Sequence, residues 1–231
     1  IEVLEDGKYR LILKTDAETL SLCSLSYERL GDADEKPVAE LSYDMKLWAS
    51  FNDWSGQDMQ RNGDDLIWWC EADVPAGGGE FGIKNAAMDG WYSSENNSKN
   101  IVLEEGHYMF FIELEVVDGK PVLKDEIIAE EPAYYVVGTC GNAGWAADAN
   151  AENTAYKMTE QDSKYVLTVT FTEDETVDWA ENKVAFKVAY GCGGKVANEN
   201  WFGAEGMDNV TVDPGTYTIT FDPATGAVTV E

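Results

Sequence analysis

The 231-residue chain is poor in basic residues. It has 16 lysines and arginines against 44 aspartates and glutamates, a formal net charge of −28, and a single histidine. A nucleic-acid-binding protein needs a basic surface that displaces counterions from phosphates, and anionic membranes repel an acidic protein. Both kinds of partner are therefore excluded. Because high net charge keeps proteins soluble and apart, we expect a monomer whose ligand is neutral or cationic.

Membrane-spanning and targeting segments are also missing from the sequence. No apolar run approaches the roughly 18 residues of a transmembrane helix, and no signal peptide is recognisable. We therefore expect no insertion into a membrane. Because the first residue is Ile1 rather than methionine, we expect the chain to be part of a larger multidomain protein.

The four cysteines form no zinc-binding pattern. Cys23, Cys70, Cys140 and Cys192 are far apart, and none lies in a Cys-x-x-Cys pair. Cys140 and Cys192 each neighbour a glycine in the second half of the chain, so they are the candidates for a disulfide in an oxidising compartment. The alternative is four free thiols.

Catalytic motifs are likewise missing. The single histidine, His107, lies in a segment with strand character, and the sequence suggests no Ser-His-Asp arrangement and no glycine-rich phosphate loop. With 44 carboxylates, any pair that could serve a glycosidase is uninformative. Residues 148–153 alternate oxygen-bearing side chains as a calcium loop does, but they lack its glycine and distal glutamate. We expect no enzymatic activity and no cofactor, with calcium as the weaker alternative.

A long internal repeat is the most informative feature that is present. Residues 100–108 read Asn-Ile-Val-Leu-Glu-Glu-Gly-His-Tyr, and residues 209–217 read Asn-Val-Thr-Val-Asp-Pro-Gly-Thr-Tyr. Four further landmarks recur upstream in the same order: residues 52–54 and 142–145, Met59 and Met158, residues 81–83 and 186–188, and residues 91–92 and 201–202. This period is too long for a solenoid of repeats of about 20–50 residues, so it indicates two lobes with separate cores.

Strand patterns run through both copies. Residues 164–171 and 215–221 alternate apolar and polar side chains, and the second of these segments returns over 227–230 through a turn with Pro223 and Gly226. We predict an all-β chain of two tandem, immunoglobulin-like antiparallel β-sandwiches, related by internal duplication.

The lobe boundary is expected at a short charged turn near Glu130 and Pro132. It divides the chain into residues 1–131 and 132–231, and the short linker predicts that the lobes touch along a groove. An extra hairpin over residues 7–25 opens the chain. We favour its strands as the leading strands of the first lobe, because an isolated hairpin is marginally stable. The alternative is the remnant of an earlier repeat.

Tryptophans at repeated positions outside the expected cores are the candidate binding residues. We align residues 66–70 of the first lobe with residues 165–169 of the second, so that Trp68 matches Leu167 and Trp69 matches Thr168. Alternation from Leu66 to Ala72 then places Trp68 in the core and Trp69 on the other face. There, Trp69 is either a ligand platform or packs under a loop or the other lobe. Four more tryptophans occupy repeated positions in expected loops, where binding residues concentrate: Trp54, Trp91, Trp145 and Trp201. The alternative is that each of the four plugs one end of a sandwich.

A sugar ring explains why such tryptophans recur beside amides. A pyranose has an apolar C–H face that covers an aromatic ring, and a rim of hydroxyls that pairs with polar side chains. Covering about 100 Å² contributes about 2–3 kcal/mol, and two sites on one polymer increase the affinity further. The polar candidates near the tryptophans are Gln57, Lys84, Asn85 and Asn96 in the first lobe, and Asn142, Lys187, Asn198 and Asn200 in the second.

One family resemblance is visible in these residues. Residues 47–54, Leu-Trp-Ala-Ser-Phe-Asn-Asp-Trp, resemble the first strand and turn of glycogen- and starch-binding modules. The order of strand, Trp, Phe-Lys-Val strand, Trp loop and Gly-Thr-Tyr hairpin is similar to the tandem lobes of outer-membrane starch-utilisation lipoproteins. Two such lobes in an acidic chain most resemble the second domain of starch adherence system proteins in amylosome-forming gut bacteria.

The resemblance implies a non-catalytic, extracellular or cell-surface module that binds starch, amylopectin and maltooligosaccharides. It departs from the pattern at Phe51, which Cys140 or Gly141 matches, and at Lys84 and Lys187, which are offset by two positions. The full set of expected carbohydrate-binding residues is Trp54, Trp91, Tyr92, Trp145, Trp201, Phe202, Trp69, Lys84, Lys187, Gln57, Asn142 and Asn198. The alternative function is a structural or protein-interaction sandwich of a secreted multidomain protein.

Overall fold

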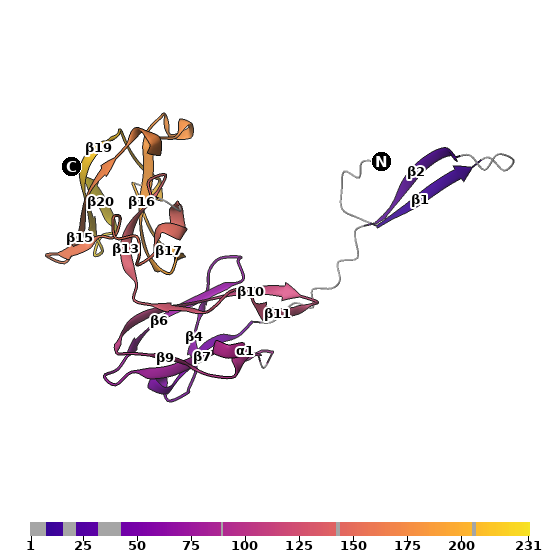
Figure 1. Ribbon diagram of the computed structural model, residues 1–231, viewed down its shortest axis with the longest axis horizontal. Coiled ribbons are helices and arrows are strands. Elements are labelled where there is room, and N and C mark those ends of the chain that lie inside the picture. The colour runs from indigo at the N-terminus through magenta and orange to yellow at the C-terminus, as the bar shows by residue number, and fades with distance from the viewer. Residues whose placement is uncertain (1–7, 16–21, 32–42, 89, 142–143, 205–206) are drawn as a thin grey trace. The chain divides into compact units, whose positions relative to one another are not determined.

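The computed structural model describes residues 8–15, 22–31, 43–88, 90–141, 144–204 and 207–231 (Figure 1). The chain divides into two compact units: Ile1–Ser42 with Val116–Pro121, and Tyr43–Glu115 with Val122–Glu231. In the first unit, β1 (Lys8–Thr15) and β2 (Leu22–Gly31) form an antiparallel two-stranded sheet of their own. Strands from Met45 onward make up both sheets of the first lobe, and among the described residues the hairpin pairs with none of them. Its assignment to the first lobe stays a prediction.

The first lobe is a sandwich of two antiparallel sheets. One sheet has the order β11 (Lys120–Leu123), β10 (Gly106–Val117), β6 (Ile67–Val74) and β5 (Gln60–Arg61), with β12 (Ile128–Glu130) also paired to β10. The other has the order β4 (Gln57–Asp58), β3 (Met45–Ala49), β7 (Gly79–Asn85) and β8 (Gly90–Tyr92), with β9 (Ile101–Leu103) on β7. A short η1 (Ser50–Asn52) follows β3, and α1 (Ser94–Asn97) follows β8. Side chains of both sheets meet in one apolar core.

The second lobe repeats this architecture. One sheet contains β13 (Ala133–Gly138), β16 (Val184–Cys192) and β17 (Lys195–Phe202), with β18 (Val210–Val212) on β16. The other has the order β14 (Thr159–Gln161), β15 (Lys164–Phe171), β19 (Gly215–Asp222) and β20 (Ala227–Val230). Its described loops contain the 3₁₀ turns η2 (Trp145–Asp148), η3 (Glu173–Glu175) and η4 (Asp178–Ala180). A second apolar core lies between the sheets, and the predicted pair of β-sandwiches is confirmed.

Strand register shows the duplication residue by residue. Ile83 of β7 pairs with Leu47 and Tyr92, and Val188 of β16 pairs with Val136 and Phe202. The backbone N–H of Met59 donates to the Met45 carbonyl at 2.9 Å, and Met158 donates to the Tyr134 carbonyl at 2.8 Å. Three of the landmarks matched in the sequence are therefore structural equivalents: Met59 and Met158, residues 81–83 and 186–188, and residues 91–92 and 201–202.

One expected alignment is displaced. Val74 pairs with Gly106 in the first lobe and Phe171 pairs with Gly215 in the second, so Trp68 corresponds to Tyr165 rather than to Leu167. The error is two residues, and an even shift leaves each side chain on the same face of its strand. The prediction that Trp68 is a core residue is therefore confirmed, and its side chain is 3% exposed.

A mixed apolar and polar contact joins the two lobes. Trp69, Met109 and Phe111 of the first lobe cluster with Cys192 and Ala197 of the second. Beside them, the buried Asn62 carboxamide accepts a hydrogen bond from the backbone N–H of Asn198 at 2.7 Å. Lys195 forms an ion pair with Glu113.

The described cysteines are free thiols in three different environments. Cys70 lies in the first core, Cys140 in the second, and Cys192 in the cluster that joins the lobes. The possible Cys140–Cys192 disulfide is therefore wrong for this structure, because the two residues belong to separate apolar clusters. The side chain of Cys23 lies outside the described residues. Burial raises the pKa of Cys70, Cys140 and Cys192 to about 12.

We predict that these three thiols are unreactive in the folded protein. In a Cys23→Ser variant at pH 8, a thiol reagent should label the native chain slowly, because the thiolate is the nucleophile and a raised pKa keeps it scarce. All three should react promptly in denaturant without reductant. A single reactive thiol under those conditions would contradict the free state of Cys140 and Cys192.

Replacing Asn62 tests the contact between the lobes. Asn62→Ala leaves the Asn198 N–H without its acceptor, so we expect the free energy of unfolding to fall by about 1–3 kcal/mol. Urea denaturation followed by circular dichroism measures this change. Gln60→Ala, at an exposed position of the adjacent β5, is the matched control and should alter stability by less than about 0.5 kcal/mol. Equal effects of the two substitutions would show that the carboxamide bridge contributes nothing.

Candidate functional site

In the second lobe, a structured loop places Trp145 at the start of η2. Trp145 and the preceding Gly144 have positive φ angles of 50° and 73°. Asp148 is buried and accepts the Gly144 N–H at 2.7 Å, while its backbone carbonyl accepts a hydrogen bond from Asn153 Nδ2 at 3.2 Å. Asp148, the first residue of the calcium-like segment 148–153, thus stabilises its own loop. Among the described residues, no group of three acidic, histidine or cysteine side chains is placed to hold a metal ion.

Trp145 meets Trp201 of β17. The ring centroids are 6.3 Å apart and the planes are inclined by 53°. Both side chains are half-buried, so part of each ring is open to solvent. Tyr135, Val137 and Ala189 are fully buried in one apolar cluster, and Trp201 packs against it. Trp201 is therefore supported from below, and Trp145 contacts its ring from the neighbouring loop.

A lysine lies on the same face as this pair. Ala189 of β16 pairs with Trp201, so the two side chains lie on the same, outer face of the sheet. Lys187 is two residues away from Ala189 along β16 and therefore points to that face as well. Diagonal cross-strand neighbours lie within reach of long side chains. Lys187 thus places a flexible cation beside Trp201.

The corresponding face of the first lobe is built differently. Trp91 of β8 pairs with Lys84, and its indole lies against Gly82, where a side-chain methyl would overlap the ring. Trp48 of β3 pairs with Gly82 from the other side, and the Lys84 Nζ lies 5.8 Å from the Trp48 ring centroid. Trp48 and Trp91 are both half-buried. This outer face therefore combines two indoles and a lysine around one glycine.

Trp48 was missed in the sequence analysis. Its signal was the alternation in β3, where Met45, Leu47 and Ala49 are buried and the residues between them point outward. The Trp48 ring points outward beside Lys46 and cannot pack in the core, so the pattern indicates a contact on the outer face.

The two lobes exchange the lysine and a small residue. By strand register, Gly82 of the first lobe is equivalent to Lys187 of the second, and Lys84 is equivalent to Ala189. The offset of two positions expected from the sequence is thus a real structural difference. Since Lys187 fills the position that Gly82 leaves open, Trp201 cannot lie flat there as Trp91 does. Trp201 instead packs beside Ala146 and the Trp145 ring.

Trp54 occupies the turn after η1. It has a φ of 54°, and its N–H donates to the Ala49 carbonyl at 2.9 Å. Asn52 holds this turn, because its carboxamide donates to the Leu47 carbonyl and accepts the Ala49 N–H. The Asn-Asp-Trp motif is therefore partly structural. Trp54 is half-buried and, among the described residues, makes no close ring contact with Trp91 like that between Trp145 and Trp201.

Three of the aromatic candidates do not lie on the outer tryptophan faces. Tyr92 is 5% exposed and lies in the first core. Phe202 packs beside the second core, where its ring centroid lies 4.5 Å from that of Phe221. Each of the two follows an outward-pointing tryptophan on its strand and therefore points inward. Trp69 is 8% exposed in the cluster that joins the lobes. Of its two alternatives, burial favours packing over a ligand platform. Trp91 and Trp201 themselves lie on strands and not in loops.

The expected amides are mostly used within the fold. Gln57 donates to the Glu71 carbonyl at 2.8 Å, and buried Asn85 accepts the Asp44 N–H at 3.1 Å. Asn198 is exposed and lies against Gly63 of the first lobe rather than beside Trp201. Asn200 is half-buried on β17. Asn142 and the side chain of Asn96 lie outside the described residues.

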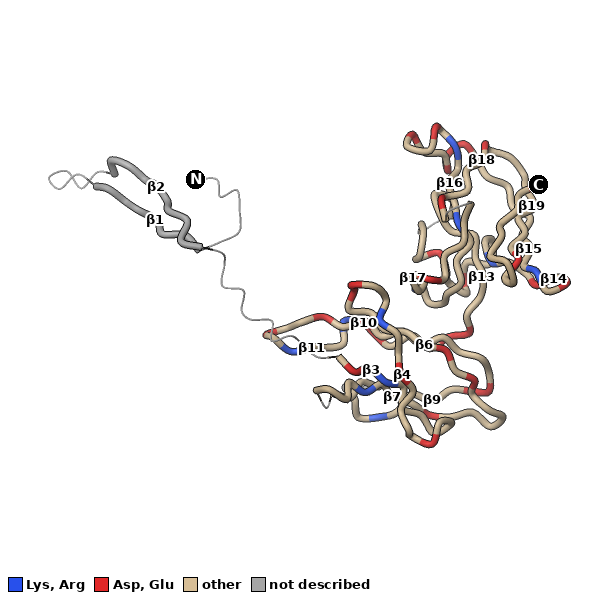
Figure 2. Tube along the Cα trace, turned by 180° about the vertical axis from the view of Figure 1, so that it is seen from behind, with Lys and Arg blue, Asp and Glu red and all other residues tan. Residues whose placement is uncertain are grey.

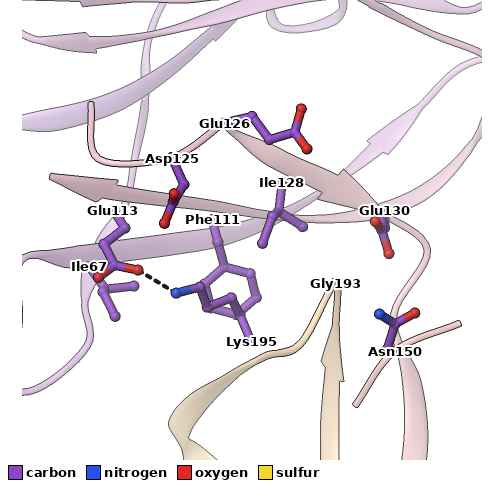
Figure 3. A pocket seen from close by; sticks show the side chains of 10 residues that line it. All are labelled: Ile67, Phe111, Glu113, Asp125, Glu126, Ile128, Glu130, Asn150, Gly193 and Lys195. Atoms are coloured by element: carbon purple, nitrogen blue, oxygen red, sulfur yellow. Dashed lines mark hydrogen bonds and ion pairs between the residues drawn. The ribbon is translucent and has the colours of Figure 1, made fainter. Parts of the chain in front are cut away.

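A pocket of about 530 Å³ lies where the lobes meet (Figure 3). Its base is apolar, with Ile67, Phe111 and Ile128, and its walls carry four carboxylates. Hydrogen bonds from Lys124 and Lys195 lower the pKa of one of them, Glu113. The pocket contains none of the expected carbohydrate-binding residues.

Acidic residues are distributed over both lobes (Figure 2). In the part of the chain that the structure describes, there is no helix with the length and apolar character needed to cross a membrane.

Gly82→Ala tests the position of Trp91. The added methyl must displace the indole, so we expect a red shift of tryptophan emission and a loss of about 1–3 kcal/mol in the free energy of unfolding. Gly119→Ala, where no atom lies within 4 Å, controls for the loss of a glycine, although its φ of 75° adds backbone strain. Unchanged emission in Gly82→Ala would contradict the contact between Trp91 and Gly82.

Comparison with known proteins gives a weak likeness to a solved structure. No protein-family model matches the sequence, and no curated protein matches it. Among solved structures, the crystal structure of SusF from Bacteroides thetaiotaomicron is similar over 81% of this chain, with 14% sequence identity and a TM-score of 0.36. The matched region spans 47% of the SusF chain, so this chain is similar to about half of that protein.

Proposed function

We propose that this protein is a non-catalytic carbohydrate-binding module for α-1,4-glucans, namely starch, amylopectin and maltooligosaccharides. The observation that carries the proposal is the Trp145–Trp201 pair, two half-buried residues whose ring centroids lie 6.3 Å apart with planes inclined by 53°. Trp201 packs on a buried apolar cluster. Two inclined rings suit a ligand whose successive apolar faces change direction. A helical α-glucan is such a ligand.

The chemistry around the rings favours a neutral sugar. The chain's net charge of −28 opposes an anionic ligand, and Lys187 supplies donors for sugar hydroxyls beside Trp201. Stacking of one sugar on one ring removes roughly 100 Å² from water and contributes about 2–3 kcal/mol. A single lobe therefore binds weakly, and the second lobe is what makes binding to a polymer strong.

In the first lobe, Trp48, Trp91 and Lys84 form the equivalent contact surface under this proposal. Trp54 adds a further indole at the end of the same sheet. Simultaneous engagement of both lobes by one polymer makes the second contact intramolecular, which raises the overall affinity without new contacts. We place the module at the cell surface or outside the cell, where such polymers are found.

The first test is selective depletion. Insoluble starch should remove the protein from solution while cellulose should not, because a flat β-glucan does not match two inclined rings. Titration with maltoheptaose should then produce a saturable change in tryptophan fluorescence. Absence of both signals would overturn the proposal and direct attention to a protein partner.

Replacing both Trp145 and Trp201 tests the proposal most directly. Trp145→Ala with Trp201→Ala should weaken maltoheptaose binding to the second lobe by about tenfold or more, at roughly 1.4 kcal/mol per factor of ten. The affinity for soluble amylopectin should fall by a larger factor than the affinity of the whole chain for maltoheptaose. The variant can no longer bind one polymer through both lobes, so it loses the affinity gained from simultaneous binding. Isothermal titration calorimetry measures both. Trp145→Phe with Trp201→Phe keeps aromatic faces and should retain most binding; equal losses for both ligands would contradict the two-lobe argument.

A further inference from the structure

One tryptophan has no role in the fold or in the site described above. Trp179 lies on η4 in the loop between β15 and β16, and its side chain is 62% exposed. All the other tryptophans of the chain are buried or half-buried. An indole this open to water gains little from folding, and tryptophan is enriched at binding surfaces, where its flat face covers a partner.

The loop that carries Trp179 is held by specific contacts. Thr172 caps η3, and both its backbone N–H and its hydroxyl donate to Glu175 Oε2, at 2.6 and 3.0 Å. A bridge between Val177 and Lys183 closes the loop, and Ala180, next to Trp179, is buried. The indole is therefore presented from a fixed turn, and its ordering costs little when a ligand binds.

The same loop is tied to the loop of Trp145. Glu175 Oε1 accepts the Tyr156 hydroxyl at 2.8 Å, and the carboxylate also accepts the Gly141 backbone N–H. Gly141 packs against the Asp148 carboxylate, which accepts the N–H of the residue before Trp145. Hydrogen bonds between Thr139 and Ala185 join the ends of β13 and β16 beside them. Trp179 and the Trp145 loop thus belong to one connected end of the second lobe.

The first lobe has no counterpart of this device. Its equivalent connection, between β6 and β7, is the four-residue turn Pro-Ala-Gly-Gly over residues 75–78. A requirement common to both sandwiches therefore does not explain Trp179. The long aromatic loop is a property of the second lobe alone.

The surroundings of Trp179 define the ligand class. Glu173, Asp174, Asp178 and Glu181 are exposed in the same loop. These carboxylates repel anions and accept hydrogen bonds from hydroxyl groups. An indole face bordered by carboxylate acceptors suits a neutral polyhydroxylated ring, with its apolar face on the aromatic and its hydroxyls on the acceptors.

We propose that Trp179 is an additional glycan contact of the second lobe, separate from the Trp145–Trp201 pair and reached by a chain that extends beyond it. This inference rests on the proposed function. It assigns the second lobe a preference for long glucan chains over short ones, because a short oligosaccharide that covers the pair leaves Trp179 unoccupied.

Trp179→Ala tests the inference against chain length. The substitution is at an exposed position, so the variant should fold, and near-ultraviolet circular dichroism checks this. We expect its affinity for amylopectin to fall by about thirtyfold to a hundredfold while its affinity for maltotriose stays unchanged, as expected for loss of one stacking contact. Trp179→Phe should retain most of the polymer affinity. Val102→Ala, at an exposed position of the first lobe, is the control and should change neither.

Parallel titrations of the wild type and of the Trp145→Ala, Trp201→Ala variant separate the possible failures. If the wild type binds amylopectin and loses affinity without the pair, but Trp179→Ala binds like the wild type, the additional contact is wrong and the proposed function stands. Equal loss for maltotriose and amylopectin would also overturn it, by placing Trp179 in the same subsite as the pair. If the wild type binds neither glucan, the proposed function fails and this inference fails with it.

Discussion

The alternation of side chains along one central strand in each lobe is the constraint on which the rest of the structure depends. In β7 and β16, Phe81 and Phe186 are fully buried in the cores, and their neighbours Gly82 and Lys187 point to the outer faces. Strands on both sides are held in register with this central strand, so their residues are sorted in the same way. The cores and the tryptophan faces are therefore two consequences of one pattern.

Duplication preserved the cores and let the outer faces diverge. A core position must fit close-packed neighbours, whereas an outward position meets solvent and accepts change at little cost. The exchange between Gly82 with Lys84 and Lys187 with Ala189 shows this freedom. It gives the first lobe an indole lying on glycine, and the second a pair of inclined rings. Two lobes of one fold thus offer different surfaces, and the Trp179 loop increases the difference.

Much of the fold and part of the site could be predicted from the sequence. Period-2 alternation and the repeat predicted two sandwiches, and three of the shared landmarks proved to be equivalent in register. The β6–β15 alignment was displaced by two residues, because neighbouring alternating strands look alike at even shifts. Trp69 could not be assigned, since its environment depends on Cys192 and Ala197, which are far away in the chain. Tyr92 and Phe202 were misplaced because their neighbours were read as loops.

The sequence by itself determined the strand periodicity, the two-lobe duplication, the acidic surface and the recurrence of tryptophans outside the cores. All of these follow from local patterns or from composition. Only the tertiary structure decided which tryptophans meet. Trp145 and Trp201 are brought together by a loop folding back over the outer face of β16 and β17, Trp48 joins Trp91 through β7, and Trp179 remains exposed. These placements depend on long-range pairing and packing, which no local pattern encodes.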